Sequence, residues 1–204
     1  MTLLFIFDMD QVLYDYNWKI RMGSLTAHTG LSLEELRRRW WHEEGEFAAE
    51  AGLFQTGDEY IEAFCEAIGQ RVDKKDWARM RGSAMTPWPE SIAAVERASQ
   101  LGQITLLTNN GALAGEHLSE WAPDLAALFG DHLRTSSFYG ARKPNTAVFE
   151  SVLERYGVDA GNTFFADDMA INVEAAASLG IDAHLFTTSA GMHAAIEEFA
   201  ASRS

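Results

Sequence analysis

The 204-residue sequence is short of cysteine and of basic side chains, and both shortages exclude classes of protein. A lone cysteine, Cys65, excludes an intrachain disulfide and a metal cage built from several thiolates. Lysine and arginine number 16 against 30 aspartates and glutamates, so the formal net charge is −14. Such an acidic surface repels nucleic-acid phosphates and anionic lipid headgroups, so we expect neither nucleic acid nor a membrane as a partner.

Long hydrophobic runs are also missing. The apolar run over residues 3–7 is too short for a signal peptide or a membrane span, and it leads directly into Asp8. We therefore expect a cytoplasmic protein. Hydrophobic residues still make up 47% of the chain, which is enough for one packed core that carries a single insertion.

Short apolar runs recur along the chain, and the first three of the four end in a cluster of polar residues. They cover residues 3–7, 103–107, 163–166 and 181–186. Continuous apolar runs of this length are typical of buried strands in a parallel sheet. Apolar residues at helical spacing separate the later runs, over 91–101, 145–156 and 170–179. The alternation predicts an α/β fold with a doubly wound, Rossmann-like parallel sheet.

Residues 16–88 do not follow this alternation. The segment contains helical stretches over 33–50, 58–69 and 73–81, and it contains no convincing strand. Residues 86–89 read Thr-Pro-Trp-Pro, which is typical of a hinge that returns the chain to the sheet. We therefore expect an α/β core of residues 1–15 and 89–204, with residues 16–88 inserted as an all-helical cap.

Acidic side chains follow the first predicted strand, at the position where ligands bind in open α/β sheets. Asp8 and Asp10 are two residues apart. Two like charges this close are costly unless a cation binds or one of the acids is protonated. The pair suits a nucleophile with a general acid/base, and it equally suits a turn or a helix cap.

Polar residues near the other predicted strands also allow either a functional or a purely structural interpretation. Thr108 and Asn109 fit either a phosphate site at a helix N-terminus or an N-capping turn. Lys143 is suited either to offsetting the charge of a phosphoryl group or to a position on the solvated surface. Asp167 and Asp168 follow a strongly apolar run, and burying both without a partner would be expensive. A hard divalent ion such as magnesium resolves that cost, so this pair favours a functional site.

Together these clusters resemble the haloacid dehalogenase superfamily of hydrolases, whose four motifs occur here in the family's order. The motifs read FIFDMDQVL over residues 5–13, LLTN over 106–109, RKP over 142–144 and FADDMAIN over 165–172. The resemblance spans the whole chain. Residues 16–88 match the place of a helical C1-type cap, as in the phosphatase-like branch of subfamily I.

The resemblance implies a magnesium-dependent phosphatase that hydrolyses a small phosphate monoester. Asp8 would attack phosphorus, and Asp10 would act as the general acid and base. Thr108 and Asn109 would hold the transferring phosphoryl group, and Lys143 would stabilise its charge.

The resemblance also implies a metal site. Mg²⁺ would bind Asp8, the backbone carbonyl of Asp10, and Asp168. Asp167 would orient Lys143 or a water on the metal. Asn172 stands where many relatives carry another acid, so its role is open.

One residue departs from the family's pattern. Gln11 replaces the glycine that usually follows the second aspartate, so a side chain there would narrow the pocket or contact the substrate.

A sugar phosphomutase, a 2-haloacid dehalogenase and a non-catalytic binding protein are the rival functions. A dehalogenase needs neither metal nor a second acid, so Asp10 and Asp168 argue against it. Sugar phosphates, nucleotides and short organic acids are all candidate substrates, and the oligomeric state is open.

Overall fold

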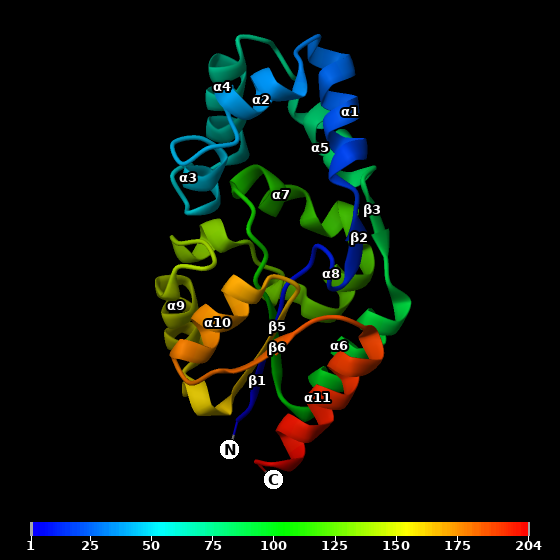
Figure 1. Ribbon diagram of the computed structural model, residues 1–204, viewed down its shortest axis with the longest axis vertical. Coiled ribbons are helices and arrows are strands. Elements are labelled where there is room, and N and C mark those ends of the chain that lie inside the picture. The colour runs from blue at the N-terminus through cyan, green and yellow to red at the C-terminus, as the bar shows by residue number, and fades with distance from the viewer. Residues whose placement is uncertain (1, 204) are drawn as a thin grey trace.

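A parallel sheet with helices on both faces forms the lower half of the molecule (Figure 1). The computed structural model describes residues 2–203, and in that range the sheet has four strands in the order β4-β1-β5-β6. The strands are β1 (Leu4–Phe7), β4 (Gln103–Leu106), β5 (Thr163–Asp167) and β6 (Asp182–Leu185). In register, Phe7 lies beside Leu106 and Ala166, so the residues that follow these three strands meet at one edge of the sheet.

Different helices cover the two faces, as the alternation of side chains along β1 requires. Phe5 and Phe7 pack with α6 (Pro89–Leu101), α8 (Pro123–Phe129) and α11 (Ser189–Ala201). Leu4 and Ile6 pack with α9 (Thr146–Tyr156) and α10 (Ala170–Ser178). The prediction of a doubly wound α/β fold is confirmed. Between residues 2 and 203, no helix combines the length and the hydropathy that a membrane crossing requires.

A helical lobe lies over the carboxyl edge of the sheet (Figure 1). Its helices are α1 (Trp18–Thr29), α2 (Leu33–Arg39), α3 (Glu46–Glu50), α4 (Gly57–Ile68) and α5 (Lys74–Gly82). These helices are termed the cap. Their apolar interior is aromatic, with Trp40, Tyr60 and Trp77 all buried in it. It also includes Leu113 of α7 (Ala112–Trp121), so the cap rests on a helix that follows β4.

The sequence prediction was wrong at two places around the cap. Residues 33–50 are not one helical stretch, because the chain turns between α2 and α3, where a side chain on Gly45 would collide with the carbonyl of Trp40. Strands were not expected near the cap, yet β2 (Tyr14–Tyr16) pairs with β3 (Met85–Pro87). Strands of three residues are too short to show an alternating pattern. The two connections between cap and sheet therefore form an antiparallel ribbon, and part of the expected hinge is a strand.

Candidate active site

The residues that follow β1, β4 and β5 line one cavity beneath the cap. Its volume is about 210 Å³. The lining residues are Asp8, Asp10, Gln11, Thr108, Asn109, Lys143, Asp168, Met169 and Asn172. The structure thus brings together all of the site residues that the sequence suggested except Asp167, which lies behind this wall and is fully buried.

Lys143 links the ends of two strands through buried ion pairs. Its Nζ lies 2.9 Å from Oδ1 of Asp8 and 2.6 Å from Oδ2 of Asp167. Burial alone would lower the pKa of Lys143, but the two carboxylates outweigh burial and raise that pKa. The lysine is therefore a fixed positive charge beside the proposed nucleophile.

Asn109 holds the backbone of Lys143. Its Nδ2 donates to the carbonyl oxygen of Lys143, and its Oδ1 accepts from the amide of the same residue, both at 2.9 Å. These two bonds show that the Asn109 side chain positions the backbone of Lys143. Nδ2 carries a second hydrogen that they do not use, and Asn109 lines the cavity, so its contact with a phosphoryl group stays a prediction.

Thr108 keeps a hydroxyl proton available to a ligand. Its Oγ1 accepts a hydrogen bond of 2.9 Å from Nδ2 of Asn110, so the hydroxyl hydrogen remains free to donate. Asn110 was missed by the sequence analysis as a positioning residue, although it directly follows Thr108 and Asn109.

Asp167 is surrounded by hydrogen-bond donors. Its Oδ1 accepts from the amide of Met169 at 2.8 Å, and its Oδ2 accepts from Lys143. Nδ2 of Asn172 lies 3.0 and 3.1 Å from the two oxygens. These contacts are those of a residue that orients Lys143 and Asn172.

The acids of this edge outnumber the cations that pair with them. Asp8, Asp167 and Asp168 each offer a carboxylate oxygen within 4.8 Å of the others. Asp10 adds a fourth carboxyl group, whereas two cations, Lys143 and Arg81, pair with this cluster.

The pKa values at this edge also indicate a shortage of positive charge. Burial raises the pKa of Asp8 to about 8, and Asp167 and Asp10 add to the rise against the opposing effect of Lys143. Burial, followed by the charge of Asp167, raises the pKa of Asp168 as well. A hard divalent cation binds carboxylate oxygens and would stabilise the ionised form of these acids, so these residues fit magnesium.

Arg81 of the cap reaches the second acid of the first motif. Its Nη2 lies 2.9 Å from Oδ1 and 2.7 Å from Oδ2 of Asp10. Its guanidinium carbon lies 3.9 Å from the centre of the Tyr16 ring. The sequence analysis missed Arg81, because it lies 71 positions from Asp10 along the chain and no local pattern connects the two.

Gln11 adopts a backbone conformation that glycine adopts more easily. Its φ is 62°, which is uncommon for a residue with a side chain. Its amide donates to the carbonyl of Tyr14, and its Nε2 donates to the carbonyl of Tyr16 at 2.8 Å. Gln11 therefore ties the cavity wall to the ribbon strand β2, in addition to lining the cavity.

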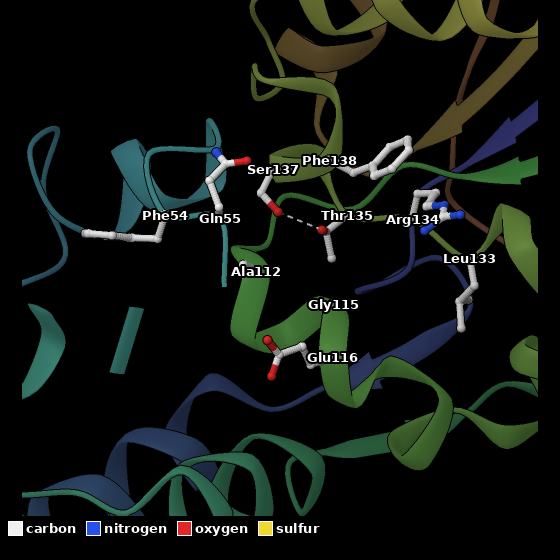
Figure 2. Close-up of a pocket in the computed structure, with 10 residues that line it drawn as sticks. All are labelled: Phe54, Gln55, Ala112, Gly115, Glu116, Leu133, Arg134, Thr135, Ser137 and Phe138. Atoms are coloured by element: carbon white, nitrogen blue, oxygen red, sulfur yellow. Dashed lines mark hydrogen bonds between the residues drawn. The ribbon is translucent and has the colours of Figure 1, made fainter. Parts of the chain in front are cut away.

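A larger cavity of about 430 Å³ lies beside α7 and contains none of the proposed catalytic residues (Figure 2). Figure 2 shows Thr135 and Ser137 on its wall, joined by a hydrogen bond of 2.8 Å. The carboxylate of Glu116, another lining residue, already pairs with Lys74 at 2.6 Å. The smaller cavity at the sheet edge is therefore the candidate active site.

Comparison with known proteins agrees with this geometry. The family model of haloacid dehalogenase-like hydrolases matches residues 2–180. A curated relative, Phosphatase MT3486 from Mycobacterium tuberculosis (strain CDC 1551 / Oshkosh), is 27% identical over 187 residues, which cover 88% of this chain and 85% of the relative.

Solved structures share the fold at lower sequence identity. The HAD family enzyme BT-2542 from Bacteroides thetaiotaomicron has a TM-score of 0.76 and 22% identity, covering 91% of this chain and 94% of that one. Its complex with magnesium and inorganic phosphate has a TM-score of 0.73 and 20% identity, covering 92% and 95%. A 2-haloacid dehalogenase from Pseudomonas syringae pv. Tomato DC3000 has a TM-score of 0.59 and 20% identity, covering 89% and 84%. Because the family model spans most of the sequence, the chain belongs to the haloacid dehalogenase-like hydrolases and is an enzyme of that family.

Proposed function

We propose that the protein is a magnesium-dependent phosphatase that hydrolyses a small phosphate monoester through an aspartyl-phosphate intermediate on Asp8. The observation that carries this proposal is the carboxylate cluster at the sheet edge. Asp8 lies there with a second acid, Asp10, and the cluster has more carboxyl groups than the two cations, Lys143 and Arg81, that pair with it. Attack on a carbon–halogen bond would need neither the second acid nor the cation.

In the first step, an oxygen of Asp8 attacks phosphorus, and the bond from phosphorus to the ester oxygen breaks. Asp10 gives a proton to the departing ester oxygen. In the second step, Asp10 takes a proton from water, the water oxygen attacks phosphorus, and phosphate leaves while Asp8 is restored.

Charge stabilisation accompanies both steps. Lys143 offers its ammonium, and Thr108 offers its hydroxyl hydrogen, to the oxygens of the transferring group. Asp8, Asp168 and the backbone carbonyl of Asp10 would hold Mg²⁺, which supplies positive charge to those same oxygens when bound.

Two relatives support this proposal. The curated relative is named a phosphatase, and BT-2542 was solved with magnesium and inorganic phosphate. The cavity volume of about 210 Å³ is below the usual range of sites for drug-sized ligands, so it favours a substrate with a small leaving group.

The test is phosphate release from a panel of small phosphate esters, with Mg²⁺ and then with EDTA. We expect release with Mg²⁺, loss of release with EDTA, and a loss on the order of 10⁴-fold or more in the Asp8→Asn variant. Asp15→Asn is the matched control, because Asp15 is an exposed aspartate on β2 and should leave the rate unchanged.

Other outcomes would redirect the assignment. Release that persists in Asp8→Asn would contradict the mechanism. Halide release from a 2-haloacid, without phosphate release from any ester, would favour the dehalogenase reaction. Isomerisation of a sugar phosphate without net phosphate release would favour a phosphomutase.

A further inference from the structure

Several buried N–H groups of the cap and of α7 have no hydrogen-bond partner among residues 2–203. They are Nε and Nη1 of Arg81, Nη2 of Arg21, and the indole nitrogens of Trp18, Trp77 and Trp121. All of these atoms are donors. A group of buried donors without acceptors is costly in a folded protein, and a ligand that supplies acceptors would remove that cost.

All of these donors except that of Trp18 belong to side chains that are in contact with one another. The guanidinium of Arg81 lies 5.7 Å from the ring centre of Trp121, and that ring lies 6.0 Å from Trp77. The guanidinium of Arg21 lies 4.8 Å from the ring centre of Trp77. The cap and α7 therefore bring two cations and two indoles together.

Arg81 has the largest unmet hydrogen-bonding capacity of this group. Its side chain is 1% exposed, and of its three nitrogens only Nη2 has a partner within the described chain, the carboxylate of Asp10. The ring of Tyr16 lies under the guanidinium and restrains its plane. Arg21 restrains Tyr16 in turn, because its Nη1 donates to the Tyr16 hydroxyl at 3.2 Å.

The position of Arg81 relates it to the leaving group of the substrate. In the proposed function, Asp10 protonates the ester oxygen, so the leaving group begins beside Asp10. Arg81 lies 2.7 Å from Asp10 and therefore lies on the leaving-group side of the phosphorus atom. A guanidinium with free N–H groups pairs best with a carboxylate or a phosphate.

We propose that Arg81 determines substrate specificity by binding a second anionic group, a carboxylate or a phosphate, that the leaving group carries a few atoms from the ester oxygen. Nη2 of Arg81 pairs with Asp10, and Nε and Nη1 are the donors for this group. This inference rests on the proposed phosphatase function and adds the chemical class of the substrate to it.

The first test compares esters that differ only in the second group. The probes are 2-phosphoglycolate, which carries a carboxylate, ethylene glycol bisphosphate, which carries a phosphate, and 2-hydroxyethyl phosphate, which is neutral at that end. We expect kcat/KM of the wild type to favour one of the two anionic esters over the neutral ester on the order of 10²-fold. The ester that is favoured identifies which anion is the natural group.

Variants then assign the preference to Arg81. In Arg81→Met the ratio of kcat/KM between anionic and neutral ester should fall below about tenfold, and Arg81→Lys should give an intermediate ratio because it keeps charge but loses the planar donor fork. This ratio of kcat/KM values stays the same when a variant loses activity equally toward all of the esters. Arg79→Met is the control, because Arg79 is an exposed arginine on the same helix, 67% exposed at its side chain, and should leave the ratio unchanged.

A binding measurement separates this inference from the proposed function. Calorimetry on Asp8→Asn with Mg²⁺ should show tighter binding of the favoured anionic ester than of 2-hydroxyethyl phosphate, and Arg81→Met added to it should remove the difference. Equal kcat/KM for anionic and neutral esters in the wild type overturns the role of Arg81 and leaves the phosphatase intact. Absence of phosphate release from any ester overturns the phosphatase, and equal affinity for the esters then overturns the role of Arg81 as well.

Discussion

The sheet edge and the cap both bury charged side chains, but the sheet edge lacks positive charge and the cap lacks hydrogen-bond acceptors. At the sheet edge, Lys143 is shared between two carboxylates, and the cluster around Asp8 still lacks positive charge. In the cap, Arg21 and Arg81 keep buried N–H groups for which residues 2–203 offer no acceptor. The sheet edge thus favours a cation, and the donors of the cap, which reach the cavity through the pair of Arg81 with Asp10, favour an anion. A metal ion and a substrate with anionic groups would satisfy both requirements.

The unpaired donors of the cap do not arise from poor packing of the cap as a whole. Glu46 is equally buried in the cap interior, and its Oε2 accepts from Nε1 of Trp40 and from the hydroxyl of Tyr60, both at 2.5 Å. The shortage of acceptors is concentrated near α7, with Arg81, Trp77 and Trp121 around it. Within the buried cap, the group around Glu46 is therefore hydrogen-bonded, whereas the donors beside α7 have no acceptor among residues 2–203.

The largest change in stability that we expect from a single substitution is at Lys143. In Lys143→Met, the carboxylates of Asp8 and Asp167 lose their common cation while they remain buried. We expect a loss of about 3–5 kcal/mol in the free energy of unfolding without metal, measured by urea denaturation in EDTA. Lys75→Met, at an exposed lysine, should change it by less than about 0.5 kcal/mol. Equal stability of the two variants would show that the sheet edge does not depend on this lysine.

The next effect concerns Glu50 of α3, where the cap meets Arg142. Their atoms Oε2 and Nε lie 2.6 Å apart, yet burial, followed by the charge of Glu46, raises the pKa of Glu50 from 4.5 to about 8. An acid with a raised pKa in the folded state contributes stability below its unfolded value of 4.5, and this contribution is lost as pH rises through about 8.

Glu50→Gln should remove this dependence. Its stability relative to the wild type should rise with pH between those values, by at most about 1.4 kcal/mol per pH unit. Urea denaturation across the pH range measures the difference, with the exposed Glu66→Gln as the control. A constant difference between Glu50→Gln and the wild type would contradict the raised pKa.

The smallest expected effect compares two buried tryptophans of the cap. Trp40 and Trp77 are each 3% exposed, but only the first donates its indole N–H, to Glu46. Replacement by phenylalanine removes the same volume in both cases. We expect Trp40→Phe to cost about 1–3 kcal/mol more than Trp77→Phe, because Glu46 loses a donor. Equal costs in thermal or urea unfolding would mean that the Trp77 N–H is also partnered.

The sequence was sufficient where local pattern determines position. Asp8, Thr108 and Asp168 each lie near the end of an apolar run, and parallel strands bring their carboxyl ends to one edge, so their convergence followed from the pattern. The Arg-Lys-Pro motif led to Lys143, which lies on a loop, through the family resemblance and not through strand alternation.

The sequence was insufficient where contacts are long-range or strands are short. Arg81 stands in a cap helix, and only the folded chain brings it to Asp10. Asn109 was placed correctly near the site, but its two bonds to the backbone of Lys143 depend on a loop geometry that spacing does not specify. The ribbon of β2 and β3 has three residues per strand and includes Pro87, so its strands carry no alternation and resembled a hinge.

The most direct measurement of the central claim is the capture of the phosphorylated enzyme. The wild type with Mg²⁺ and the best ester of the panel is quenched in acid during turnover, and the peptide that contains Asp8 is weighed by mass spectrometry. We predict one added phosphoryl group on Asp8, which is lost on treatment with hydroxylamine and is absent in Asp8→Asn. Rapid phosphate release with no phosphorylated peptide, or with the phosphoryl group on another residue, would contradict the account.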